Sequence, residues 1–237
     1  MSLFAQRLAV IQGRIETACH RARRSVDQVR LMAVSKVHPA EALAEALAAG
    51  VALFGENRVQ EFETKREQLR TMGATGAEVH LIGHLQSNKS AKAAEIFDGI
   101  DSVDSLRLAE RLNDAAGKLG KRLPILLEIK LSEEATKSGL DPDGSETRSL
   151  LERLPNWTNL AMLGLMTIAP LDENPESARG CFRRLRSLRE KWSVEFPRLS
   201  FGELSMGMSG DFEIAIEEGA TLVRVGTALF GGRSRPG

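Results

Sequence analysis

A lysine within the N-terminal third of the chain is a candidate for covalent chemistry. Lys36 ends the apolar run 29–36, VRLMAVSK, and is followed at once by Val37, His38 and Pro39. A lysine amine can form a Schiff base with an aldehyde, so a lysine at a strand end could hold a carbonyl compound covalently. Taken alone, a lysine in this position is more often a side chain that simply extends into water.

Two turns of small residues near the end of the chain indicate a site for an anion. One turn is 205–211, SMGMSGD, the other is 224–227, RVGT, and each leads into a helix or a helical tail. Small side chains let backbone N–H groups converge on an anion, the hydroxyls of Ser209 and Thr227 add donors, and a following helix start adds partial positive charge. Alternatively, both are ordinary strand-to-helix turns with glycine for positive φ and a serine cap.

The elements that would position these residues can be read from the alternation of short and long segments. Short β-branched or leucine-rich runs alternate with longer amphipathic stretches, which is typical of parallel strands joined by crossover helices. The expected strands are 29–36, 52–56, 79–84, 99–104, 124–131, 160–167, 199–206 and 221–226. The expected helices are 40–49, 58–70, 87–97, 105–119, 146–154, 177–196 and 211–218, with one further helix at the N-terminus over about 3–24.

This order predicts an α/β fold: a single (β/α)8 TIM barrel with an extra N-terminal helix, forming one domain over residues 1–237. An open doubly wound sheet is the alternative. It is disfavoured because no GxGxxG follows the first run and the glycines cluster after the last two. In a barrel the chemistry lies at the carboxyl ends of the strands, and the loops after strands seven and eight frequently hold a phosphate.

Closure of such a barrel brings the two candidate features together. Strand one then lies beside strand eight, so Lys36 stands close to the predicted anion site, with Arg224 between them on the lumen side. An amine beside a bound phosphate suggests an aldehyde that carries a phosphate, and pyridoxal 5′-phosphate (PLP) is the commonest such cofactor. Arg224 would meet the pyridine nitrogen. A permanently charged guanidinium cannot protonate that nitrogen, so the ring would be a weaker electron sink than one paired with Asp.

Composition excludes several other classes of protein. The chain has 32 Lys and Arg against 32 Asp and Glu, so no overall field attracts nucleic acid or an anionic membrane. We expect no membrane span and no signal peptide, and hence a cytoplasmic location. Cys19 and Cys181 are far apart and outside any ligand spacing, and His80 and His84 lack a third partner, so no metal site is predicted.

Seven motifs follow one another along the chain: AVSKVHP from 33, FGENRVQE from 54, HLIGHLQSNK from 80, SVDS from 102, GLMTIAP from 164, LSMGMSGDFE from 204 and VRVGTALFG from 223. In this order they resemble the pyridoxal phosphate homeostasis protein family, and the resemblance spans about residues 30–231. A more distant resemblance is to the barrel domain of alanine racemase, without that enzyme's additional β-domain.

The resemblance implies a barrel that binds PLP through Lys36, with Arg224 facing the ring nitrogen and Asn57 beside the ring. Further residues implied at the phosphate are Ser209, Gly226 and Thr227, with Ser205, Met206, Gly207 and Met208 forming the loop around it.

An enzyme remains the alternative to a binding protein. A racemase needs two proton carriers on opposite faces of the cofactor, and in the alanine racemase design the second is a tyrosine. This chain has no tyrosine, which leaves His84 or His38 as substitutes. We therefore expect a noncatalytic protein of PLP homeostasis that buffers the aldehyde and delivers it to PLP-dependent apoenzymes. We also expect a monomer. The alternative function is that of a PLP-dependent racemase or isomerase.

Overall fold

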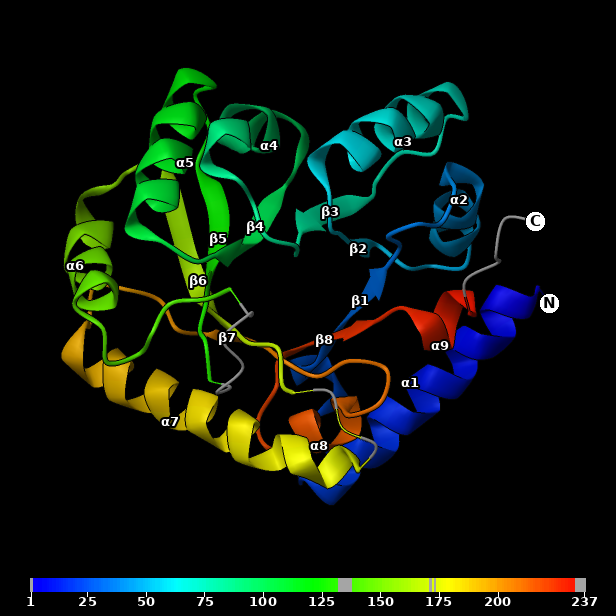
Figure 1. Ribbon diagram of the computed structural model, residues 1–237. Helices are drawn as coiled ribbons and strands as arrows, with labels where there is room; N and C mark the ends of the chain where they lie inside the picture. The colour runs from blue at the N-terminus through cyan, green and yellow to red at the C-terminus, as the bar shows by residue number, and fades with distance from the viewer. Residues whose placement is uncertain (1, 132–137, 171, 173, 233–237) are drawn as a thin grey trace.

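The computed structural model describes residues 2–131, 138–170, 172 and 174–232. Within them, parallel strands follow one another around a closed barrel in chain order, and the last strand pairs with the first (Figure 1). The strands are β1 (Arg30–Val34), β2 (Leu53–Glu56), β3 (Glu78–Leu81), β4 (Gly99–Val103), β5 (Leu123–Glu128), β6 (Leu160–Met166), β7 (Glu203–Ser205) and β8 (Leu222–Val225). The predicted TIM barrel is confirmed.

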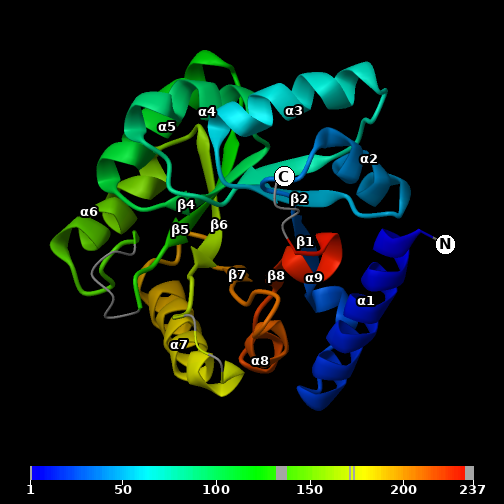
Figure 2. The same cartoon turned by 45° about the vertical axis from the view of Figure 1, so that its right-hand side comes forward.

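Helices cover the outside of the barrel (Figure 2). They are α2 (Ala40–Ala48), α3 (Val59–Thr71), α4 (Ser90–Ile96), α5 (Leu106–Lys118), α6 (Ser145–Arg153), α7 (Arg179–Glu195), α8 (Phe212–Glu217) and the short α9 (Thr227–Phe230). Four 3-10 turns, η1 (Val26–Gln28), η2 (Ser87–Lys89), η3 (Leu154–Asn156) and η4 (Pro175–Ala178), complete the regular structure of the described residues.

The extra N-terminal helix is α1 (Leu3–Arg21), which ends three residues before the predicted boundary. Ser2 caps it by accepting a hydrogen bond from the N–H of Ala5. Its buried face repeats every three or four residues, and the helix lies against α8 and α9 (Figure 1). The residues of this face are Phe4, Leu8, Ile11, Ile15, Ala18 and Cys19. Helix α1 therefore covers the seam where the last strands return to the first.

The register between β8 and β1 decides where the carboxyl ends of these strands lie. Met32 pairs with Arg224, and Ala33 pairs with Val225. One step further on, a side chain at Gly226 would come within 3.2 Å of the Val34 carbonyl oxygen. The turn after β8 therefore packs directly on the end of β1, as barrel closure predicted.

Alternation along the strands separates the lumen from the layer between barrel and helices. Met32, Leu53 and Leu222 form a small cluster inside the barrel, separate from the main hydrophobic core beneath the helices. Cys19 and Cys181 are both buried. No helix of the described residues combines the length and the apolar character that crossing a bilayer requires.

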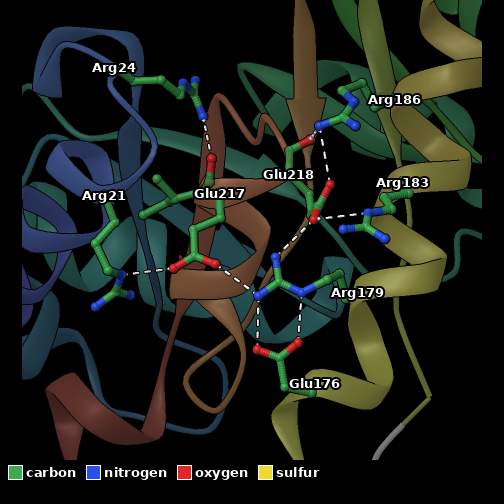
Figure 3. Close-up of polar contacts among 9 residues, drawn as sticks. Arg21, Arg24, Glu176, Arg179, Arg183, Arg186, Glu217 and Glu218 are labelled. Atoms are coloured by element: carbon green, nitrogen blue, oxygen red, sulfur yellow. Dashed lines mark hydrogen bonds and ion pairs between the residues drawn. The ribbon is translucent and has the colours of Figure 1, made fainter.

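A charged cluster joins three outer helices (Figure 3). Arg179 at the start of α7 donates to Glu217 and to Glu218 at 2.8 Å each, and it also pairs with Glu176 of η4. Arg21 of α1 reaches Glu217 at 2.8 Å. The end of α8 is thus tied to both α1 and α7.

Candidate cofactor-binding site

A cavity of about 380 Å³ opens at the carboxyl ends of the strands. Much of its wall is formed by residues that were predicted from the sequence to bind a cofactor: Lys36, Asn57, Met208, Ser209, Arg224, Gly226 and Thr227. The barrel therefore brings together residues from the ends of β1, β2, β7 and β8, which are far apart in the chain.

Lys36 lies in a turn that follows β1. The sequence predicted that the strand continues to this lysine, but the strand ends at Val34. The chain then turns through Lys36 and Val37, and Val37 adopts a left-handed backbone with φ of 62°. This turn leaves Lys36 exposed and on the cavity wall, whereas continued strand pairing would have kept it in the ladder.

Arg224 is buried and held on two sides within the barrel. Its Nη1 donates to Ser205 Oγ at 2.7 Å, and its Nη2 donates to the carbonyl oxygen of Thr167 at 2.8 Å. Its Nε donates to no described residue, and the side chain lines the cavity. Burial lowers the pKa of this guanidinium, while the negative charges of Asp101 and Glu128 act to raise it. These two hydrogen bonds use two of the five N–H groups of the guanidinium, so a fixed cation keeps donors for a ligand.

Three predicted residues lie behind the wall rather than on it. Ser205 is fully buried and positions Arg224. Met206 packs in the main core. Gly207 has φ of 93°, and its carbonyl accepts a hydrogen bond from the N–H of Arg224 at 3.0 Å. These residues support the loop from the interior of the protein. The left-handed backbone of the glycine turns the chain from β7 toward the cavity.

The two turns predicted to bind an anion face each other. Ser209 Oγ accepts a hydrogen bond from the Gly226 N–H at 3.3 Å, which joins the turn after β7 to the turn after β8. Among the described residues, nothing accepts from the N–H groups of Ser209, Gly210, Thr227 or Ala228. Free backbone donors at adjoining turns are the arrangement in which proteins bind phosphate.

Asn57 offers a polar atom without a protein partner. Its Oδ1 is buried and makes no hydrogen bond within the described residues. The backbone of Asn57 is tightly enclosed, because any side chain at Gly83 would collide with it. A buried amide oxygen without a partner is costly, so a ligand beside Asn57 would satisfy it.

A further part of the cavity wall was not predicted from the sequence. It comes from the segment that joins β6 to α7, together with two apolar residues of the barrel mouth. These residues are Ile168, Pro170, Asp172, Asn174, Pro175 and Ala178, with Val34 and Ile82. The motif GLMTIAP ends in this wall, and its place after a strand was the available signal.

The histidines considered as proton carriers lie outside the cavity wall. His84 Nδ1 is 2.7 Å from Asp104 Oδ2, and His38 stacks on Phe230 with ring centroids 4.9 Å apart. Burial lowers the pKa of His38. His80 lies within the barrel between Asp101 and Glu78. The described residues contain no group of three or more acidic, histidine or cysteine side chains arranged to hold a metal ion.

Comparison with known proteins identifies the family. The sequence profile described as "Alanine racemase, N-terminal domain" matches residues 10–234. The pyridoxal phosphate homeostasis protein of Aquifex aeolicus is 42% identical over 228 residues, which cover 96% of this chain and 97% of the relative. The Escherichia coli protein of the same name is 41% identical, with 98% of each chain covered. The chain belongs to the pyridoxal phosphate homeostasis protein family.

Solved structures of this family agree with the barrel. PipY of Synechococcus elongatus without PLP superposes with a TM-score of 0.85 at 43% identity, covering 96% of this chain and 100% of PipY. The structure of PipY with PLP bound gives a TM-score of 0.84 at 42% identity, with the same coverage. Alanine racemase of Clostridium difficile is 16% identical with a TM-score of 0.67, and the match covers 58% of that chain. This last likeness shows the fold alone.

Proposed function

We propose that this protein binds PLP through Lys36 and serves PLP homeostasis. The observation that carries the proposal is the meeting, on one cavity wall, of a lysine amine, a pair of turns with free N–H groups and a buried arginine. When bound, PLP supplies an aldehyde, a phosphate and a pyridine nitrogen. The names of the homeostasis relatives and the PLP-bound PipY structure support the same reading.

Different residues of this chain would bind different chemical groups of the cofactor. Lys36 would hold the cofactor through its aldehyde carbon, because an unprotonated amine and an aldehyde condense reversibly with loss of water. Ser209, Gly226 and Thr227 would hold the phosphate, with Met208 in the loop around it. That loop rests on Ser205, Met206 and Gly207.

The ring of the cofactor would lie between Asn57 and Arg224. The Nε–H of Arg224 can donate a hydrogen bond to the pyridine nitrogen. The amide of Asn57 adds a polar contact beside the ring. Because arginine keeps its proton, the ring nitrogen stays unprotonated and withdraws electrons weakly. Such a site favours holding PLP over carbanion chemistry.

We propose that the protein is not an enzyme, with no catalytic residues assigned. A racemase would require a second proton carrier opposite Lys36, and the chain has no tyrosine. His84 and His38 are engaged by Asp104 and Phe230, away from the cavity wall. Incubation with D and L amino acids in deuterated buffer should show no exchange of α-protons above background. Rapid exchange that disappears in Lys36→Ala would establish the racemase alternative.

The remaining proposals concern the protein in the cell. We propose one domain over residues 1–237, a monomer in the cytoplasm, and delivery of PLP to PLP-dependent apoenzymes without nucleic acid or membrane partners. A reversible covalent site limits the reaction of free aldehyde with other amines, which is the chemical reason for such buffering. Light scattering after size exclusion tests the monomer directly, and a dimer mass would overturn it.

The attachment itself is tested by reduction and mapping. Protein mixed with PLP is treated with borohydride, weighed intact and digested for peptide mapping. We expect one added cofactor on the peptide that contains Lys36, and none in Lys36→Ala. Lys118→Ala removes an exposed lysine at the end of α5 and should leave the adduct unchanged. An adduct on another lysine in the native protein would show that the attachment point is wrong.

A further inference from the structure

The residue before Lys36 is fixed by a buried ion pair outside the barrel lumen. Ser35 Oγ donates to Glu56 Oε1 at 2.7 Å, and the Ser35 carbonyl accepts from Lys65 Nζ at 3.0 Å. Lys65, which comes from α3, also lies 2.9 Å from Glu56 Oε1. The backbone on the N-terminal side of Lys36 is therefore anchored to a helix of the outer layer.

The residue after Lys36 is fixed by the same ammonium group. The N–H of Val37 donates to Glu61 Oε1 at 2.6 Å, and Lys65 Nζ lies 2.7 Å from that oxygen. Lys65 thus joins both anchors of the turn, one on each side of Lys36. None of the three charged residues of this cluster, Glu56, Glu61 and Lys65, lines the cavity.

The cluster is poorly explained by stability alone. The side chains of Lys65 and Glu56 are 7% and 0% exposed, so both charges are removed from water at considerable cost. Glu56 Oε2 is buried and accepts no hydrogen bond within the described residues. An apolar pair of similar size often stabilises a fold equally well, so a cluster of this kind suggests a demand for fixed geometry.

The turn has a conformation that needs such an anchor. Val37 has φ of 62°, which is strained for a β-branched residue because its side chain crowds the backbone there. Val37 is 60% exposed, so packing does not hold the conformation. Two hydrogen bonds hold it instead: the N–H of Val37 donates to Glu61, and the N–H of His38 donates to the Ser35 carbonyl at 3.1 Å and closes the turn.

We propose that Lys65 is a positioning residue for Lys36: with Glu56 and Glu61 it holds the 35–37 turn in its strained form, so that the amine of Lys36 stays at the cavity. The inference rests on the proposed attachment of PLP to Lys36. Without this clamp of Lys65, Glu56 and Glu61, Val37 relaxes to an extended backbone, and Lys36 follows the direction of β1 away from the turn.

The first test removes the ammonium and keeps the bulk. Lys65→Met should weaken PLP binding by about tenfold or more, as expected for release of a strained backbone. The binding is measured by the visible absorbance of the bound cofactor. Lys121→Met is the matched control, since Lys121 Nζ holds the carbonyl of Phe97 at 3.0 Å far from the turn. This control should lose stability without losing affinity. Equal loss of affinity in both variants would show a merely structural role.

A second substitution separates turn geometry from general damage. Glycine adopts positive φ without strain, so Val37→Gly added to Lys65→Met should recover most of the lost affinity, although it restores no charge. If Lys65→Met does not fold, Glu61→Leu removes the Val37 anchor and keeps the pair of Lys65 with Glu56, whereas Glu61→Gln keeps an acceptor. We expect weakened binding in Glu61→Leu and near-native binding in Glu61→Gln. Absence of rescue by Val37→Gly, or equal affinities in the two Glu61 variants, would overturn the proposal.

A measurement without cofactor distinguishes failure of this inference from failure of the proposed function. Hydrogen exchange of the Val37 amide in the ligand-free protein should be slow, and faster by about tenfold or more in Lys65→Met, as loss of its anchor predicts. Native exchange in that variant would refute the clamp even if Lys36 carries PLP. Conversely, a native protein that forms no adduct at Lys36 refutes the proposed function, while accelerated exchange would still establish the clamp.

Discussion

The guanidinium of Arg224 and the hydroxyl of Ser205 meet inside the barrel, where Nη1 donates to Oγ at 2.7 Å. The two residues come from neighbouring strands, β8 and β7. Because Nη2 also donates to the carbonyl of Thr167, the guanidinium plane is fixed where the side chain lines the cavity, with N–H groups left for a ligand. Ser205 therefore affects the cavity indirectly, because it holds Arg224 in place without lining the cavity itself.

Removal of this hydroxyl should loosen the arginine. Ser205→Ala leaves a buried charged donor without its acceptor, and we expect a loss of about 1.5–3 kcal/mol in the free energy of unfolding, measured by urea denaturation, together with weaker PLP retention. Ser193→Ala removes a hydroxyl that bonds only to a carbonyl of its own exposed helix and should cost little. An unchanged retention in Ser205→Ala would show that Arg224 needs no such support.

Substitution of Arg224 should affect retention more than attachment. Arg224→Ala removes the donor proposed for the pyridine nitrogen but leaves Lys36 and the two turns proposed to hold the phosphate, so borohydride should still trap the adduct. We expect faster loss of PLP on dialysis before reduction. Arg198→Ala, at an exposed position before β7, serves as control. Equal dialysis rates would mean that the guanidinium does not face the ring.

His80 should remain protonated well above neutral pH. Burial alone would lower its pKa, but hydrogen bonds to Asp101 and Glu78 outweigh burial and raise the pKa to about 10. The resulting stability is complete below the ordinary histidine pKa of about 6.5 and is lost as the pH rises toward 10. Nitrogen chemical shifts should report a doubly protonated ring through about pH 8 in the folded protein and an ordinary titration in urea. An ordinary titration in the folded protein contradicts this assignment.

The cluster in Figure 3 should give stability that depends on acid pH. The hydrogen bond from Arg179 lowers the pKa of Glu217 below its ordinary value. This contribution is present above the ordinary carboxyl pKa and is lost as the pH falls through the lowered value. Arg179→Ala should therefore cost about 1–2 kcal/mol near neutral pH, and the difference from the native protein should shrink in acid. Arg70→Ala breaks an exposed pair and should show almost no effect at either pH; a constant difference for Arg179→Ala would contradict an ionic origin.

Gly207 should tolerate no side chain. A Cβ there would meet Phe212 and Ala215, and the residue also has positive φ. Gly207→Ala should lower the free energy of unfolding by about 2–4 kcal/mol, since strain and overpacking add. Gly50 has a similar φ with open space around it, so Gly50→Ala isolates the strain and should cost about 1 kcal/mol. Equal losses in thermal or urea unfolding would show that the contact with α8 is unimportant.

The barrel and most of the candidate cofactor-binding residues can be inferred from the amino-acid sequence alone. Eight short apolar runs separated by amphipathic stretches leave few topologies, and closure then places the ends of the first and last strands together. Strand order therefore associates Lys36 with Arg224, Ser209 and Thr227, because residue type and position at a strand end are local properties of the sequence.

How those side chains are held depends instead on contacts between segments that are distant in the chain. The exit of the chain at Val34, the left-handed Val37 and the clamp by Lys65 depend on a contact with α3 that no local pattern encodes. In the same way, the placement of Ser205 behind Arg224 follows from the register of neighbouring strands. Local preferences of the chain fix its elements, whereas burial, register and strain arise only when distant segments pack, and these fix the direction of each functional group.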